Sequence, residues 1–114
     1  MAIDADEIVK EMMDAAEEAF KDGWEAVRQY APGEFKKMAV QLEEIAANVA
    51  KFKIDPDEGY SPETAKILFG MQQRASEGVL VAMSKLTLIA VQQALNAIVK
   101  VLGNAFGGAF AGFL

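Results

Sequence analysis

The sequence predicts an all-α protein: a helical hairpin or three-helix bundle whose third, apolar helix is long and extends beyond the other two. No segment alternates apolar and polar residues between turn residues, so a strand signal is missing. Apolar residues instead recur at helical spacings over most of the chain. Proline and glycine gather at only two places before the C-terminal tail, 31–34 and 53–62, and these would divide the chain into three helical segments.

Length and charge indicate one domain with two unlike parts. The chain has 114 residues and a net charge of -6, which is the size of a single domain. Residues 1–60 carry 7 basic and 15 acidic side chains, whereas residues 61–114 carry 4 and 2. We therefore expect an acidic, amphipathic helical hairpin in residues 1–60 and a long apolar helix with a Gly/Phe-rich tail in residues 61–114. The acidic balance argues against a nucleic-acid partner, because phosphate binding needs clustered Lys and Arg.

The composition also excludes several kinds of chemistry. The chain contains neither cysteine nor histidine, so disulfides, thiolate zinc sites and His-dependent catalytic arrangements are ruled out. The acidic loop after residue 54 fails the calcium-loop pattern: counting from Asp55 places Gly59 at position 5 and Lys66 at position 12, where an EF-hand has Gly at 6 and Glu at 12. We expect no enzymatic activity, no cofactor, no metal site and no small-molecule substrate.

The first helix is expected at about residues 5–31. Asp4 is a suitable N-cap with Glu7 three residues later, Gly23 is a weak point inside the helix, and Pro32-Gly33 would end it. The apolar side comprises Ile8, Met12, Ala16, Phe20, Trp24, Val27 and Ala31. The acidic side comprises Glu7, Glu11, Asp14, Glu18, Asp22 and Glu25. We interpret the acidic side as a solvated face, with a docking face for a basic partner or a weak divalent-cation surface as the alternatives.

The second helix, at about residues 34–53, has the most regular pattern in the chain. Its apolar residues follow spacings of 3, 4, 3, 4 and 3, which is typical of a coiled-coil seam. The segment is short for a free-standing coiled coil, so we predict a helix of a bundle. The predicted seam within the chain is Phe35, Met38, Leu42, Ile45, Val49 and Phe52.

The third helix has a clear start and no evident stop before Gly103. Ser61 is a good N-cap and Pro62 suits the first helical position. A helix from residue 62 to 102 would be about 60 Å long, against about 30 Å for the second helix. From about residue 90 it would therefore extend past its own bundle, and its apolar surface would need cover from protein or lipid. The expected oligomer or membrane interface is Leu88, Ile89, Val91, Leu95, Ile98, Leu102, Gly103, Phe106, Gly107, Phe110, Ala111 and Phe113.

Two groups of polar residues interrupt this apolar half. Gln92, Gln93 and Asn96 either form register-fixing contacts in an interface or face water in a narrow stripe, and the sequence leaves both interpretations open. The basic residues Lys66, Arg74, Lys85 and Lys100 are widely spaced, and we interpret them as forming no patch. The tail itself fits a helix with one bulky and one small-residue side, which we expect to become ordered when a partner covers it.

These patterns predict a non-enzymatic α-helical assembly or structural protein that forms a homo-oligomer or docks into a larger complex. Small acidic helical proteins of phage particles or secretion machines are compositionally similar as a class. One alternative is a membrane-active protein that inserts its C-terminal segment, although the uncharged stretch 101–114 is short for a span of about 20 residues. A weaker alternative is an acidic inhibitor of a host protein. The N-terminus lacks a signal-peptide pattern, so we expect cytoplasmic synthesis, with a virion or a membrane surface as open final locations.

Overall fold

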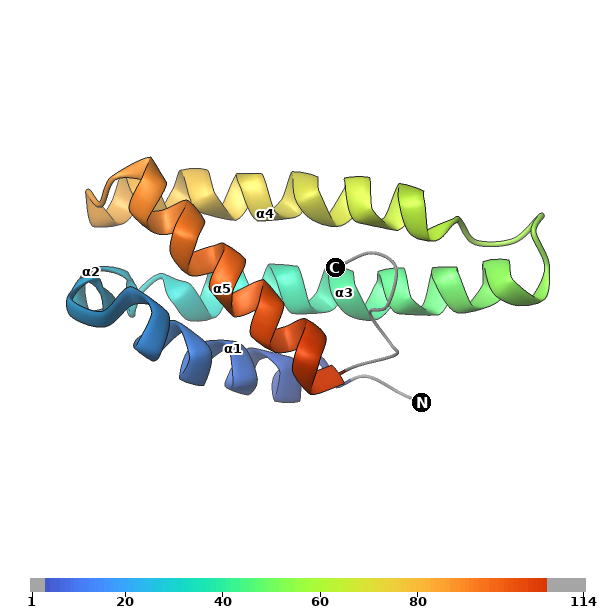
Figure 1. The fold of residues 1–114 in the computed structure, drawn as a ribbon, viewed down its shortest axis with the longest axis horizontal. Coiled ribbons are helices and arrows are strands. Elements are labelled where there is room, and N and C mark those ends of the chain that lie inside the picture. Colours follow the sequence, from blue (N-terminus) through green and yellow to red (C-terminus); the bar gives the residue numbers. More distant parts are fainter. Residues whose placement is uncertain (1–3, 107–114) are drawn as a thin grey trace.

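The computed structural model describes residues 4–106, with side chains up to Asn104, and this part of the chain is helical without strands. The elements are α1 (Ala5–Phe20), the 3₁₀ turn η1 (Lys21–Gly23), α2 (Trp24–Val27), α3 (Ala31–Ile54), α4 (Pro62–Ser84) and α5 (Leu88–Phe106). The four long helices run alternately in opposite directions, as Figure 1 shows. Each contacts the next, and α5 returns to contact α1. The bundle is thus built from four long helices, where the sequence predicted three.

Helix α1 begins as the sequence predicts and ends earlier. The Asp4 carboxylate accepts a hydrogen bond from the Asp6 backbone N–H at 2.9 Å and caps the helix. The expected single helix 5–31 is wrong, because α1 ends at Phe20 and a corner follows. A Cβ atom at Gly23 would lie 3.2 Å from a methyl carbon of Leu86, in the link before α5. Gly23 therefore lets the segment after α1 approach the link between α4 and α5 closely.

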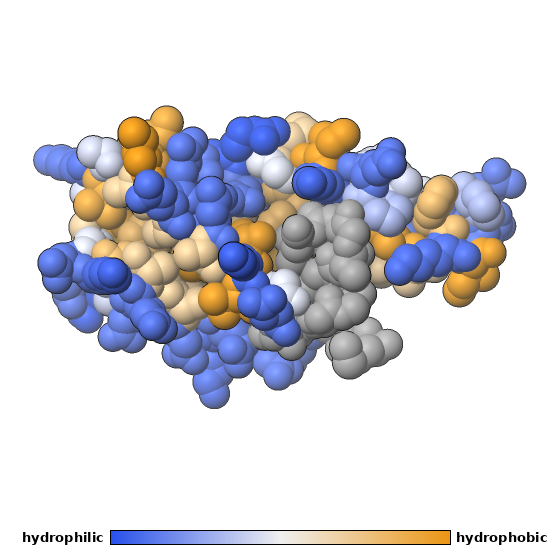
Figure 2. All heavy atoms as spheres, viewed as in Figure 1, coloured by the Kyte–Doolittle hydropathy of each residue, from blue (hydrophilic) through white to orange (hydrophobic). Residues whose placement is uncertain are grey.

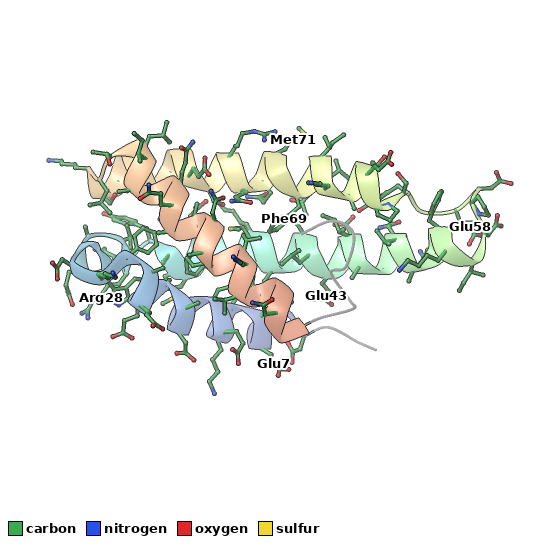
Figure 3. All side chains as sticks on the ribbon, in the orientation of Figure 1. Glu7, Arg28, Glu43, Glu58, Phe69 and Met71 are labelled. Carbon is green, nitrogen blue, oxygen red and sulfur yellow. The ribbon has the colours of Figure 1, made fainter. Side chains whose placement is uncertain are left out.

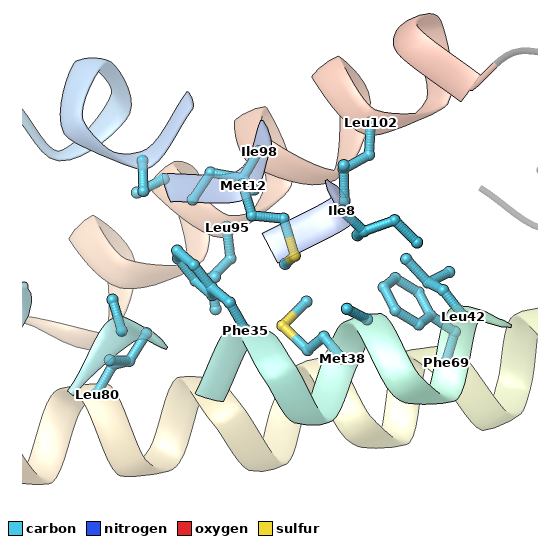
Figure 4. Packing of buried hydrophobic residues seen from close by; sticks show 14 of the residues in the cluster. Ile8, Met12, Phe35, Met38, Leu42, Phe69, Leu80, Leu95, Ile98 and Leu102 are labelled. Carbon is cyan, nitrogen blue, oxygen red and sulfur yellow. The ribbon is translucent and has the colours of Figure 1, made fainter. Parts of the chain in front are cut away.

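Helix α3 starts three residues before its predicted position. Ala31 and Pro32 form its first turn, so the Pro-Gly pair begins this helix where the sequence predicted the end of another. Proline suits a first turn because the backbone N–H it lacks would have no partner in the helix. Along α3, Phe35, Met38, Leu42, Ile45 and Val49 are buried and Phe52 is half-buried. Figure 4 shows this side of α3 packed against residues of α1 and α4.

The loop between α3 and α4 is a turn held by its own backbone and side chains. The Asp55 carboxylate accepts a hydrogen bond from the Asp57 N–H at 3.0 Å. Gly59 has a φ of 63°, and a Cβ atom there would lie 2.0 Å from the carbonyl oxygen of Asn48. Only glycine fits this position. Ser61 then caps α4 through its hydroxyl oxygen, as the sequence predicts.

The largest difference from the sequence prediction is a break after Ser84. Lys85 adopts a left-handed conformation, with φ 64° and ψ 14°, and its N–H donates to the Val81 carbonyl at 3.1 Å. Two residues later, the Thr87 hydroxyl oxygen accepts a hydrogen bond from the Ala90 N–H at 3.1 Å and caps the next helix. The predicted continuous helix from 62 onward is therefore wrong: the link 85–87 reverses the chain.

Because of this reversal, α5 lies against α1 and does not extend beyond the bundle. Val91, Leu95, Ile98 and Leu102 are all fully buried. Figure 4 places Leu95, Ile98 and Leu102 around Met12 and the neighbouring part of α1. The two helices match in length, at about 24 and 28 Å, so each covers the apolar side of the other. The prediction that the third helix extends beyond the bundle is therefore wrong.

A length mismatch does exist, in a different place. Helices α3 and α4 have 24 and 23 residues, whereas α1 and α5 have 16 and 19. The α3–α4 hairpin therefore continues past the ends of α1 and α5 on the side of the 55–61 loop, as Figure 1 shows. The molecule is correspondingly elongated, with extents of 46 × 21 × 19 Å.

Candidate interaction surfaces

The seven residues of the predicted interface whose side chains the structure describes do not share one environment. Val91, Leu95, Ile98 and Leu102 are in the chain's own core, so α1 covers them and the expected outside partner is not needed there. Leu88 and Ile89 are exposed and Gly103 is half-buried. The remaining predicted residues, Phe106, Gly107, Phe110, Ala111 and Phe113, lie outside the residues whose side chains the structure describes.

The polar residues of α5 belong to its outer side. Gln93 and Asn96 are exposed and Gln92 is half-buried, so of the two open interpretations the water-facing stripe fits better. Asn96 also accepts a hydrogen bond from the Gln73 side-chain nitrogen at 2.9 Å. This contact joins α5 to α4 near the surface. It fixes the two helices relative to each other without filling the core with polar groups.

Helix α4 carries an apolar strip on the side that faces away from the bundle. Ile67 is 63% exposed and Met71 is 56% exposed. Figure 3 shows Met71 pointing away from the bundle on the outside of α4, whereas Phe69 points inward toward the other helices. The strip continues through exposed small residues, and we call it the outer α4 row: Ile67, Met71, Ala75, Gly78 and Ala82.

A second exposed apolar area lies where α4 meets α5. Met83, Leu88 and Ile89 are 53%, 50% and 66% exposed, and Figure 2 shows hydrophobic residues gathered at this corner. From residue 75 to 90 the charged residues are Glu77, which is buried, and Lys85. This surface is therefore nearly uncharged from residue 75 onward, whereas the exposed cations Lys66 and Arg74 lie on the part of α4 that carries Ile67 and Met71. Apolar surface of this kind is typical of interaction sites.

A groove with basic residues on its rim lies between α4 and α5. It has a volume of about 430 Å³ and is lined by Lys66, Ile67, Phe69, Gly70, Gln73, Arg74 and Val99. We call it the basic groove. Neither Lys66 nor Arg74 forms an ion pair with any described residue. The sequence interpretation that these cations form no patch is corrected here: a spacing of eight residues places both on one stretch of α4, beside the same groove.

A groove of opposite charge lies between α1 and α5. It has a volume of about 450 Å³ and is lined by Glu11, Asp14, Ala15, Glu18, Ala19, Ala97 and Val101. We call it the acidic groove. Its floor consists of small side chains, visible in Figure 2 as a pale apolar area between the two helices. The acidic side chains are exposed, as expected for a solvated face. The groove itself could not be read from the sequence, because α5 supplies its second wall.

The charges of the acidic groove are also unpaired within the part of the chain that the structure describes. Within the described residues, the ion pair between two helices is that of Asp6 with Lys36, at 2.6 Å, which joins α1 to α3. This contact lowers the pKa of Asp6, chiefly through the hydrogen bond from Lys36. The same hydrogen bond raises the pKa of Lys36. The chain thus neutralises charge elsewhere on its surface and leaves both grooves charged.

Other kinds of site receive no support from the described residues. Within them, no group of three or more acidic side chains is placed to hold a metal ion, and no helix has the length and apolarity to cross a bilayer. Comparison of the chain with protein-family models, curated proteins and solved structures finds no match. The candidate sites on the described part of the chain are therefore the two apolar areas and the two charged grooves.

Proposed function

We propose that the protein is a non-enzymatic helical assembly protein whose copies associate through the outer α4 row. The observation that supports this is the exposure of Ile67 and Met71, each more than half exposed, on a helix whose opposite side is buried in the bundle. Large apolar side chains gathered on one helix face are stabilised when another surface covers them. The role resembles that of small helical components of larger particles or machines.

The proposed contact lies on α4, whereas the sequence predicted it on the C-terminal helix. The apolar side of α5 is buried against α1, so it is not available to a partner. The outer side of α4 takes its place in the proposal. A membrane-active role would have to rest on the C-terminal tail, because the apolar stripe of α5 that precedes the tail is buried against α1.

The size of the apolar contribution limits how tight such an association can be. Full burial of one Ile, Leu or Met side chain contributes about 1.5–3 kcal/mol, and Ile67, Met71, Met83, Leu88 and Ile89 are already about half buried. Covering all five would therefore contribute roughly 5 kcal/mol. Association costs about 4–15 kcal/mol in lost translational and rotational freedom. Apolar burial alone gives weak association, so a specific assembly also needs polar complementarity.

The proposal is tested by measuring the mass of the particle in solution. We expect the full-length chain to be oligomeric by light scattering coupled to size-exclusion chromatography, and the double variant Ile67→Glu/Met71→Glu to be monomeric. Because both positions are exposed, the thermal unfolding midpoint of the variant should be nearly unchanged. Val40→Glu is a matched control, since Val40 is 47% exposed on α3, and it should leave the oligomer intact.

Two results would contradict the proposal. One is a full-length chain that stays monomeric up to high micromolar concentration. The other is an oligomer that survives the double substitution unchanged. Flotation with neutral and anionic vesicles separates the membrane alternative: a chain that is monomeric in buffer and floats with vesicles would favour insertion of the tail over assembly of the bundle.

A further inference from the structure

We propose that copies of this chain associate head to tail, with the basic-groove side of α4 in one copy docked into the acidic groove of the next. This inference rests on the proposed assembly function and names the surface that covers the outer α4 row. The occupant is a second copy of this chain.

The charges of the two grooves are complementary. Lys66 and Arg74 stand on the rim of the basic groove, and Glu11, Asp14 and Glu18 line the acidic groove. None of these five residues forms an ion pair with another residue in the described part of the chain. Complementary charges steer association and fix its orientation. A contact between the two grooves would therefore supply the polar complementarity that the apolar row lacks.

The spacing of the charges along their helices also agrees. Lys66 and Arg74 are separated by eight residues of α4, which corresponds to about 12 Å along the helix axis. Glu11 and Glu18 are separated by seven residues of α1, or about 10 Å, with Asp14 between them. Two helices laid side by side could thus place each cation next to a carboxylate without bending. A single charge pair would not define such a register.

The shapes of the two surfaces fit in the same way. Ile67 and Met71 protrude from α4, whereas the floor of the acidic groove is made mainly of Ala15, Ala19 and Ala97. Small residues let a second helix approach closely, and large residues of that helix then fill the space above them. Ile67 belongs to both the outer α4 row and the basic groove, so docking at the groove would also cover that end of the row.

The position of the grooves determines the kind of assembly. Val99 lines the basic groove, while Ala97 and Val101 line the acidic groove, so the two lie on different sides of α5. A copy that uses one groove keeps the other free for a further copy. Contacts between unlike surfaces of this kind generate closed rings or open filaments, whereas a two-fold dimer uses the same surface on both copies.

The test uses two neutralised variants and their mixture. The first variant is Glu11→Gln/Asp14→Asn/Glu18→Gln, which removes the charge of the acidic groove. The second is Lys66→Gln/Arg74→Gln, which removes the charge of the basic groove. Matched controls change the same charge elsewhere: Glu7→Gln/Glu17→Gln/Asp22→Asn on the α1–η1 segment and Lys51→Gln/Lys53→Gln on α3. Circular dichroism melts verify that all four variants fold.

Each neutralised variant alone should associate at least about tenfold more weakly than the wild type, since exposed pairs contribute up to about 1 kcal/mol each. The controls should assemble as the wild type does. In an equimolar mixture, the intact acidic groove of the second variant can meet the intact basic groove of the first. Sedimentation velocity should then show a 1:1 dimer that does not grow further.

The possible failures are distinguishable. If the wild type is oligomeric and either neutralised variant assembles normally, the head-to-tail contact is wrong while the assembly function stands. The same conclusion follows if both variants are impaired and their mixture forms no dimer. A wild-type chain that is monomeric under all conditions contradicts the assembly function itself.

Discussion

Helices α4 and α5 come from the same apolar half of the sequence and end in opposite situations. Four apolar residues of α5, Val91, Leu95, Ile98 and Leu102, form a stripe that is fully buried against α1, and its apolar residues off this stripe, such as Leu88, Ile89 and Val101, are exposed. Those of α4 fall on two sides, with Phe69 and Leu80 inside and Ile67 and Met71 outside. The number of apolar residues in a helix thus indicates how much of its surface must be buried. Their distribution around the helix indicates on how many sides it needs a packing partner.

The largest expected effect is the difference between two leucine-to-alanine substitutions in α5, measured as the loss in free energy of unfolding. Leu95→Ala should lower the free energy of unfolding by about 2–5 kcal/mol, because it leaves a cavity in the core. Leu88→Ala, at a position that is 50% exposed, should change it by about 0.5 kcal/mol or less. Urea denaturation of the monomer measures both. Equal effects would mean that the stripe facing α1 is not the buried side of α5.

For the link between the two helices we predict the sign of a change in stability. Lys85 has a positive φ of 64°, which costs an ordinary residue about 1–2 kcal/mol. Lys85→Gly should therefore raise the free energy of unfolding by up to about 1 kcal/mol, after the greater flexibility of glycine in the unfolded chain is included. Ala82→Gly, within α4, is the control and should lower it by about 1 kcal/mol. If both substitutions are destabilising, α4 continues through residue 85.

The open side of α4 gives a smaller effect on stability. A Cβ atom at Gly78 would meet nothing within 4 Å apart from its chain neighbours and the backbone of its own helix, so Gly78→Ala should raise the free energy of unfolding of the monomer by about 0.5–1 kcal/mol through helix propensity. Thermal denaturation at low protein concentration measures it. A destabilising result would show that this side of α4 is packed against the chain and is not an open surface.

The smallest expected effect on stability is that of breaking the Asp6–Lys36 ion pair, which joins α1 to α3. This pair involves neither α4 nor α5, so it gives a reference value for an exposed contact. Its contact lowers the pKa of Asp6 below the usual 3.8, so its contribution is present above that value and is lost as the pH falls through the lowered pKa. Asp6→Asn should thus reduce stability slightly near neutral pH and in low salt. The difference should disappear as the pH falls through the lowered pKa of Asp6, and it should shrink in high salt. A difference in stability that persists at low pH would mean that Asp6 acts through capping of α1 and not through the ion pair.

The sequence predicted the parts of this fold that depend on local chemistry. The helical class, the Asp4 and Ser61 caps and the periodicity along α3 all follow from residue type and spacing over one or two turns. The break after Ser84 was missed because lysine occupies a left-handed position that glycine usually fills. Thr87 was the available signal, as a capping residue three positions before Ala90.

The candidate surfaces were harder to predict, for a different physical reason. Each groove has two walls from helices far apart in the sequence, so its existence depends on the reversal at residues 85–87. In a continuous helix from residue 62 onward, Ala97 and Val101 would not lie opposite Glu11 and Glu18. The acidic side of α1 was identified from its spacing, but its partner wall was not.

The central claim is that α5 folds back, burying its own apolar stripe and leaving the outer side of α4 free. The chain has no cysteine, so spin labels can be attached at Lys66→Cys and Lys100→Cys, with unlabelled chain added in excess to remove distances between copies. Lys66 and Val99 line the same groove, so pulsed electron paramagnetic resonance should give a distance within about 20 Å, two helix diameters. A distance near 50 Å, the length of about 34 residues in one helix, would contradict the account.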